Sequence, residues 1–266
     1  MTKSTLSYTL FCSAFAIALA VLLLGCEGSD PNTLTLLCGG AIRPPITGAE
    51  LEDEVGIIER FREAHPDASI ETNFGASNIL LGQLKLTQRG DLFFPGDDFY
   101  VEEAKREGLV YETRTVAQFV PVIMAANGNP LDIQEVSDLA DSNVRLAIAD
   151  PRAAAIGRIT PEIFEKNGVS FDALDNIEFT GVTAPEVAQA VELGHVDATI
   201  TWRPVAEQYH RNSVIVEIPR EDNVLSPLVI AVLETSTNKA LALEFADFIA
   251  GPEGQEVFQR YHYDVE

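Results

Sequence analysis

The sequence predicts an α/β protein with two lobes, whose mainly parallel sheets are joined by two crossing strands. Short apolar runs alternate with helical patterns from Thr33 onward, and this order starts again after about residue 118. Two longer apolar runs, 118–126 and 226–233, have the length to pass from one lobe to the other and back. With 266 residues, 46% of them hydrophobic, the chain is long enough to bury the core of such a fold.

The first lobe is expected to open with three strand–helix units. Apolar runs of the buried-strand type predict strands at 33–38, 69–74 and 91–94, and helices at 50–64, 77–88 and 97–107 follow them. In the first of these helices, Leu51, Val55, Ile58 and Phe61 recur at helical spacing. Strands that alternate with helices in this way favour a mostly parallel sheet with helices on both faces.

The second lobe repeats the pattern before the chain returns to the first. Strands are expected at 145–149, 177–180, 198–201 and 214–217, with helices that begin near Thr160, Thr183 and Arg203. The chain closes with helices at 239–250 and 252–261, because Gly251-Pro252 separates them as a helix stop and start. The expected lobes are therefore 33–117, 118–230 and a return over 231–266.

The first 25 residues are interpreted as a secretory signal. Lys3 lies in a short polar start, an apolar run follows, and Leu23-Leu24-Gly25-Cys26 ends it before the chain turns polar. The ending resembles the lipobox of bacterial lipoproteins, which implies that Cys26 is lipidated and that 26–32 form a tether. An uncleaved membrane anchor is the alternative, since the run approaches the length of a span. Either way the protein is expected to be exported, in the periplasm or on the outer face of the membrane.

Composition excludes some classes of partner. The chain has 41 acidic and 18 basic residues, a formal charge of −23, whereas nucleic-acid binding relies on lysines and arginines that neutralise phosphates. Cys12 would leave with the signal, so Cys38 is expected to be a buried thiol with no disulfide partner. The four histidines are dispersed, and neither a metal held by side chains nor a cofactor is expected. We expect a monomer.

Candidate binding segments lie where predicted strands give way to helices. Ligands of open α/β sheets bind beyond the carboxyl ends of the strands, against helix N-termini. Phe74-Gly75-Ala76-Ser77 ends a strand, and Ala149-Asp150-Pro151 opens a turn that runs to Gly157. Thr183-Ala184-Pro185-Glu186 matches a capping box.

From about Leu34 to the C-terminus, the chain resembles the molybdate-binding proteins of ABC transporters. The resemblance rests on Phe74-Gly75-Ala76-Ser77, Gly90-Asp91-Leu92-Phe93 with Gly108-Leu109-Val110, Ala149-Asp150-Pro151 to Gly157, and Gly251-Pro252-Glu253-Gly254-Gln255 with Phe258 and Tyr261. It implies the two-lobed type II periplasmic binding protein fold. It also implies a tetrahedral dianion as ligand, molybdate or tungstate, and an ABC-transporter permease as partner.

Carried over by position, the family's ligand contacts fall at Ala41, Ser77, Ile156, Val187 and Trp202. The family holds its dianion with hydroxyls and backbone N–H groups, which neutral helix N-termini can supply inside an acidic protein. Ala41 stands where the family has a serine, and Trp202 where it has a tyrosine.

Arginines in the same segments suggest a different anion. Arg43, Arg152, Arg158 and Arg203 are expected to border the cleft, and Arg43 and Arg203 are added to the candidate ligand contacts. Guanidinium groups bind carboxylate or phosphate in bidentate fashion. The alternative is that these arginines pair with acidic side chains between the lobes. Because Pro44 and Pro45 follow Arg43, its backbone is expected to be extended.

The resulting hypothesis is an exported, lipid-anchored solute-binding protein that captures molybdate or tungstate for uptake through an ABC transporter. Alternatives within the fold are sulfate, phosphate or a small organic acid as ligand, or a sensor domain in place of transport. An exported enzyme is not expected, since the spacing of Asp91, Asp97, Asp98 and Asp150 specifies no reaction.

Overall fold

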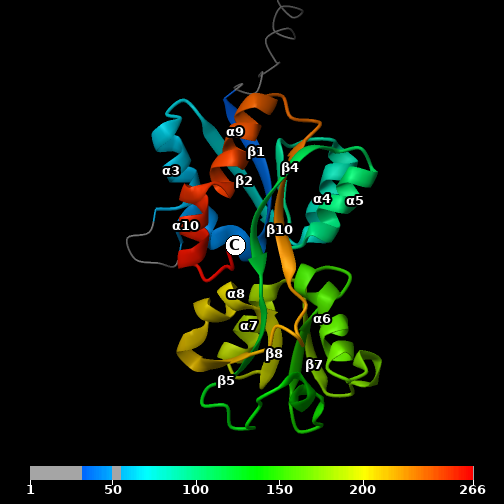
Figure 1. Cartoon of the computed structure of the whole chain (residues 1–266). Helices are drawn as coiled ribbons and strands as arrows, with labels where there is room; N and C mark the ends of the chain where they lie inside the picture. The colour runs from blue at the N-terminus through cyan, green and yellow to red at the C-terminus, as the bar shows by residue number, and fades with distance from the viewer. Residues whose placement is uncertain (1–31, 50–54, 266) are drawn as a thin grey trace, which may run out of the picture.

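The computed structural model describes residues 32–49 and 55–265 and shows two α/β lobes, one above the other (Figure 1). The strands are β1 Thr33–Gly39, β2 Ser69–Gly75, β3 Leu92–Phe94, β4 Val110–Phe119, β5 Pro121–Ala126, β6 Leu146–Ala149, β7 Ile177–Gly181, β8 Ala198–Trp202, β9 Ser213–Glu217 and β10 Ser226–Leu233. The α-helices are α2 Arg43–Thr47, α3 Ile57–Ala64, α4 Ser77–Thr87, α5 Asp98–Arg106, α6 Ala155–Lys166, α7 Ala184–Glu192, α8 Arg203–Gln208, α9 Lys239–Ala250 and α10 Pro252–Arg260. Short 3-10 turns include η1 Gly40–Ile42.

Each lobe contains one mixed five-stranded sheet. The strand orders are β2-β1-β3-β10-β4 and β7-β6-β8-β5-β9, and β10 and β5 are the strands that run antiparallel to their neighbours. Both antiparallel strands start where the chain has just crossed between the lobes. The strands that are parallel to one another run in the opposite direction and end there. The carboxyl ends of β1, β2 and β3 therefore meet those of β6, β7 and β8 at the junction.

The expected two-lobed α/β fold with mainly parallel sheets is confirmed, with differences in detail. The run 118–126 is divided at Val120 between β4 and β5. β4 extends back to Val110, and the sequence pattern did not predict this first half because it is partly exposed and lacks an apolar run. All of β10 pairs with strands of the first sheet, so the chain is back in the first lobe from Ser226 onward. The expected helix at 50–64 begins at Ile57 in the described part.

The prediction of an extended backbone at Arg43 is wrong. Arg43 has φ −50° and ψ −48° and begins the short helix α2, which Gly48 ends in a left-handed conformation. Pro44 and Pro45 lie in the first turn of this helix, where a missing N–H costs no hydrogen bond because those donors have no intrahelical acceptor.

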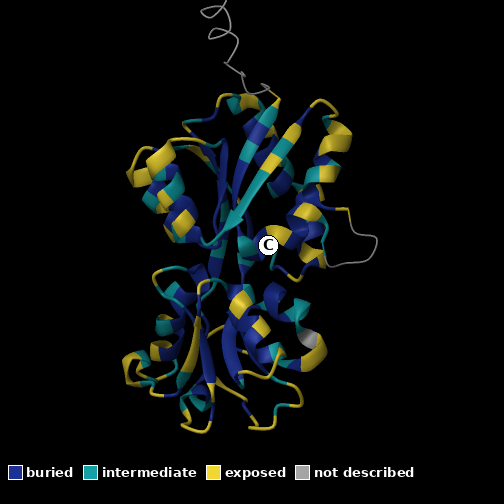
Figure 2. Ribbon diagram, turned by 180° about the vertical axis from the view of Figure 1, so that it is seen from behind, coloured by how far each residue is buried: buried dark blue, intermediate teal, exposed yellow. Residues whose placement is uncertain are grey.

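The core runs through both sheets. Figure 2 shows the central strands of the second lobe as buried; every residue of β6 and β8 is buried, whereas the edge strand β7 is largely exposed. Parallel strands covered by helices on both faces lose water from both sides, and each buried large aliphatic side chain stabilises the fold by about 1.5–3 kcal/mol. At the junction, the ring of Phe119 stacks on Trp202 with centroids 4.5 Å apart.

One buried ion pair joins the lobes. The Asp97 carboxylate is fully buried and accepts a hydrogen bond from the Arg158 guanidinium of α6 at 2.6 Å. It also accepts from the Ser226 hydroxyl at 3.1 Å and from the Phe99 N–H at 2.8 Å, so it caps α5 as well. A second link is the hydrogen bond from the Asn78 amide to the Arg152 carbonyl, 2.8 Å.

The predicted signal, Cys26 and the tether up to residue 31 lie outside the described residues. Within 32–49 and 55–265, no helix combines the length and the apolar character needed to cross a membrane.

Gly157 lets α6 approach the end of β6. A Cβ at this position would lie 2.4 Å from the Ala149 carbonyl oxygen and 2.6 Å from that of Asp150. We expect Gly157→Ala to lower the free energy of unfolding by about 1–3 kcal/mol, measured by urea denaturation. Gly82→Ala on α4 is the control, since its Cβ meets nothing within 4 Å, and it should be neutral or stabilising. A G157A protein as stable as G82A would contradict this packing.

Breaking the pair between the lobes should leave the Asp97 carboxylate buried without its partner. We expect Arg158→Met to cost about 3 kcal/mol, the lower end of the range for buried pairs because the arginine is 32% exposed. X-ray scattering should also show a larger radius of gyration as the lobes separate. Arg152→Met is the control, since that side chain is 90% exposed and pairs with Asp150 in its own loop. Equal effects of the two substitutions would contradict a lobe-joining role.

Candidate functional site

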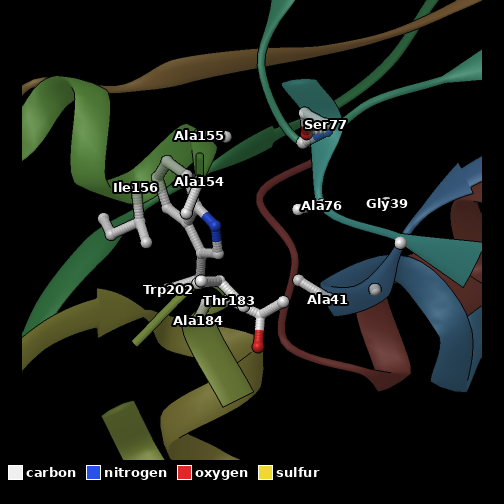
Figure 3. A pocket seen from close by; sticks show the side chains of 14 residues that line it. Gly39, Ala41, Ala76, Ser77, Ala154, Ala155, Ile156, Thr183, Ala184 and Trp202 are labelled. Carbon is white, nitrogen blue, oxygen red and sulfur yellow. Dashed lines mark hydrogen bonds between the residues drawn. The ribbon is translucent and has the colours of Figure 1, made fainter. Parts of the chain in front are cut away.

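A cavity lies between the lobes, where the six parallel strands end (Figure 3). It is built from the segments that follow β1, β2, β3, β6, β7 and β8, the position at which α/β sheets bind ligands. Its lining consists of Gly39, Gly40, Ala41, Gly75, Ala76, Ser77, Gly96, Ala154, Ala155, Ile156, Val182, Thr183, Ala184 and Trp202.

The size of the cavity restricts what it can hold. The volume open to the centre of a water molecule is about 30 Å³, equal to a sphere of roughly 1.9 Å radius, or about 3.3 Å once the 1.4 Å radius of water is added. This is the size of one tetrahedral oxyanion without its water shell.

Ser77 supplies a hydroxyl to this cavity (Figure 3). Its Oγ accepts a hydrogen bond from the Gly96 N–H at 3.1 Å, which joins the ends of β2 and β3. No described residue accepts the hydroxyl proton. Because the oxygen already receives one hydrogen bond, the proton is the group that remains for a bound anion.

Trp202 forms the wall on the side of the second lobe. Its side chain is buried against Phe119, and Figure 3 shows the indole nitrogen on the cavity side of the ring. The indole N–H can only donate a hydrogen bond. It has no acceptor among the described residues, so it adds a second neutral donor.

Helix N-termini supply further hydrogen-bond donors to the cavity. Ser77 opens α4, Ala155 and Ile156 open α6, and Thr183 caps α7 by accepting from the Glu186 N–H at 3.4 Å. The first N–H groups of a helix lack intrahelical acceptors and carry a partial positive charge. No acidic side chain is among the residues that line the cavity in the described structure. The arrangement therefore favours a small anion held by neutral donors.

The structure brings four of the sequence-predicted contacts together. Ala41, Ser77, Ile156 and Trp202 all line the cavity. Val187 does not, because it lies one turn into α7 and packs beneath Gly181, where an added Cβ would be 3.0 Å from its methyl. Ala41 contributes no hydroxyl, and its carbonyl accepts a hydrogen bond from the Tyr263 hydroxyl at 2.8 Å.

Of the four arginines near the cleft, three pair with carboxylates. Arg152 binds Asp150 at 2.9 Å, Arg158 binds Asp97, and Arg203 binds Glu217 and lies 3.8 Å from Glu207. Arg203 does not line this cavity. Arg43 differs, because its guanidinium lies over the Phe74 ring, 4.6 Å from the centroid, and lines a second cavity beside the first.

Sequence reasoning missed Gly96 and the pair Ala154 and Ala155. A Cβ on Gly96 would lie 3.2 Å from the Ala155 Cβ, so the two lobes touch here through small residues. Pro95-Gly96 before Asp97 was available as a signal, because glycine at a strand end permits close approach. The contact itself depends on how the lobes meet.

Other reactive groups have structural partners. Burial raises the pKa of the Cys38 thiol far above its usual range, so it is neutral and inert. Asp91 accepts hydrogen bonds from the Thr35 N–H and the Ser236 hydroxyl at the far end of the first lobe. In the described ranges, no group of three or more His, Cys, Asp or Glu side chains is arranged to hold a metal ion.

Comparison with known proteins agrees with this geometry. The chain is 25% identical over 205 residues to the molybdate-binding protein ModA of Mycobacterium bovis, covering 77% of each chain. It is 23% identical to YvgL of Bacillus subtilis, named as a candidate ABC-transporter substrate-binding lipoprotein, over 97% of this chain and 98% of that one. The structure of the sulfate-binding protein SubI of Mycobacterium tuberculosis superposes with a TM-score of 0.74 at 16% identity, covering 87% of this chain and 86% of SubI.

The fold is therefore that of the type II periplasmic binding proteins, with a small cavity at the junction of its lobes. Residues 34–264 match the family described as bacterial extracellular solute-binding protein. The chain belongs to this family of extracellular solute-binding proteins.

Proposed function

We propose that this protein captures a tetrahedral oxyanion outside the cytoplasm, with molybdate or tungstate favoured, and delivers it to the permease of an ABC transporter. The observation that carries the proposal is the small cavity between the lobes, which has room for one such anion and is lined by neutral donors. Binding would favour the closed arrangement of the lobes, and the closed form would be the one that docks on the permease.

Molybdate and tungstate are favoured by the sequence resemblance and by the relatives named for molybdate. Sulfate, phosphate or a small organic acid is the second candidate, because Ala41 brings no hydroxyl to the cavity. A hydrogen bond to a charged group contributes about 1.5–3 kcal/mol, so its loss is large enough to change which anion is preferred.

Thermal unfolding of the full chain in mild detergent against a panel of anions tests the proposal. The panel contains molybdate, tungstate, sulfate, phosphate and acetate. A ligand at 100 times its Kd adds about 2.7 kcal/mol, which raises Tm by roughly 5–10 °C at this size. We expect the largest rise with molybdate or tungstate. A rise in Tm with sulfate or phosphate alone would favour the second candidate ligand. No rise in Tm with any anion would reject oxyanion capture.

The same panel on Ser77→Ala locates the site. Loss of the hydroxyl is expected to weaken anion binding about ten- to hundred-fold. Ser236→Ala is the matched control, because its buried hydroxyl donates to Asp91 at 2.8 Å, far from the cavity. Both substitutions remove a buried hydrogen bond, and S77A alone should lower the affinity.

We also propose that Cys26, outside the described residues, carries the lipid that anchors the protein. The apolar run that ends in Gly25-Cys26 and the likeness to a lipoprotein support this. We expect Cys26→Ser to abolish incorporation of labelled fatty acid, while Cys12→Ser, inside the apolar run, leaves it unchanged. Unlabelled wild-type protein that stays in the membrane fraction would favour the uncleaved anchor instead.

A further inference from the structure

The C-terminal segment that follows α10 runs back to the junction of the lobes. Gln118, near the end of β4, and Asp264 exchange two main-chain hydrogen bonds, of 2.7 and 3.3 Å, as an antiparallel bridge. The Asp264 carboxylate also lies 3.7 Å from the guanidinium of Arg220, in the loop between β9 and β10. Tyr263 is buried next to this bridge. The end of the chain is therefore held at the place where β4 passes into the second lobe.

The Tyr263 hydroxyl donates a hydrogen bond to the buried carbonyl of Ala41 at 2.8 Å. In a helical turn, such a carbonyl accepts from the N–H three or four residues further on. Those positions are Pro44 and Pro45, which have no N–H. A buried carbonyl without a donor destabilises the arrangement that buries it. The tyrosine therefore supplies the donor that the two prolines withhold from the turn at Ala41.

The ring of Tyr263 supports the wall on the other side of the cavity. It packs against the Phe119 ring with centroids 5.1 Å apart, and Phe119 stacks on Trp202. Ala41 of the first lobe and Trp202 of the second both line the oxyanion cavity (Figure 3), whereas Tyr263 does not. One side chain behind the cavity thus contacts both walls, directly at Ala41 and through one ring at Trp202.

The width of the cavity depends on where its main chain lies. Most of the lining is glycine and alanine, which have no rotamers that could adjust to a ligand. A displacement of the main chain at Ala41 therefore changes the space for an anion directly. The hydrogen bond from Tyr263 opposes such a displacement.

We propose that Tyr263 is a positioning residue for oxyanion binding. Its hydroxyl fixes the Ala41 wall and its ring fixes the Trp202 wall, so that Tyr263 sets the width of the cavity and the choice among tetrahedral anions. This deepens the proposed function and rests on it for the anion itself.

Titration calorimetry with molybdate and with sulfate, on the full chain in mild detergent, tests the hydroxyl. The two anions share shape and charge and differ in size. Tyr263→Phe keeps the ring and leaves the Ala41 carbonyl without its donor. We expect this substitution to weaken binding of the preferred anion about tenfold and to bring the ratio of the two affinities closer to one.

Tyr261→Phe is the matched control. The Tyr261 hydroxyl also donates from the C-terminal segment to a main-chain carbonyl, that of Ala49 at 2.9 Å, and Ala49 does not line the cavity. A loss of stability alone would be common to both variants. We expect Y261F to keep both anion affinities and their ratio.

Fluorescence of Trp202 tests the ring without any ligand, because the chain has a single tryptophan. Tyr263→Leu removes the ring behind Phe119. We expect its emission to shift to longer wavelength and acrylamide to quench it more strongly, in protein whose circular dichroism matches the wild type. Y263F, which keeps the ring, should retain the wild-type emission.

The outcomes separate this proposal from the function on which it rests. If the wild type binds an anion and Y263F binds both anions with wild-type affinities, or if Y261F is weakened equally, the positioning role of the hydroxyl is overturned. An unchanged Trp202 emission in Y263L would overturn the role of the ring. If the wild type binds neither these anions nor any other of the panel, oxyanion capture fails, and the emission of Y263L still decides whether Tyr263 holds the Trp202 wall.

Discussion

The closed arrangement of the lobes depends on the buried carboxylate of Asp97. It receives hydrogen bonds from the first turn of α5, from Ser226 where β10 begins, and from Arg158 in the other lobe. Burial and this charge raise the pKa of Tyr100 to about 12. The Arg158 Nε is buried without a partner in the described structure, at a cost of about 1–3 kcal/mol.

Much of the fold follows from local pattern. Strands such as β1 and β6 are continuous apolar runs, and Gly251 with Pro252 marks the boundary of α9 and α10 as expected. The expectation for Arg43 was wrong because the preference of a residue before proline is weak, and a first helical turn accepts prolines. The start of β4 was missed because its first half is exposed or half-buried and contains no apolar run.

The site was only partly predictable, for a different physical reason. The end of a strand carries a local signature, which pointed to Ser77, whereas Ile156 was expected only from the family resemblance; both line the cavity. Which residues of one lobe meet those of the other is decided by tertiary packing. The contact of Gly96 with Ala155 therefore could not be predicted from the sequence. The same holds for the ion pairs of the arginines, three of which bind carboxylates.

The predominance of glycine and alanine in the cavity has a consequence for how such proteins diverge. Main-chain donors are retained by any sequence that keeps the fold, so point substitutions at Gly40 or Ala154 change the room available without deleting a donor. Under the proposed function, substitutions at these positions would change which anion fits while the main-chain donors remain, and Ser77 would be a position at which a substitution removes a donor. On this proposal, a few substitutions among the small residues that line the cavity would suffice to change the preferred anion.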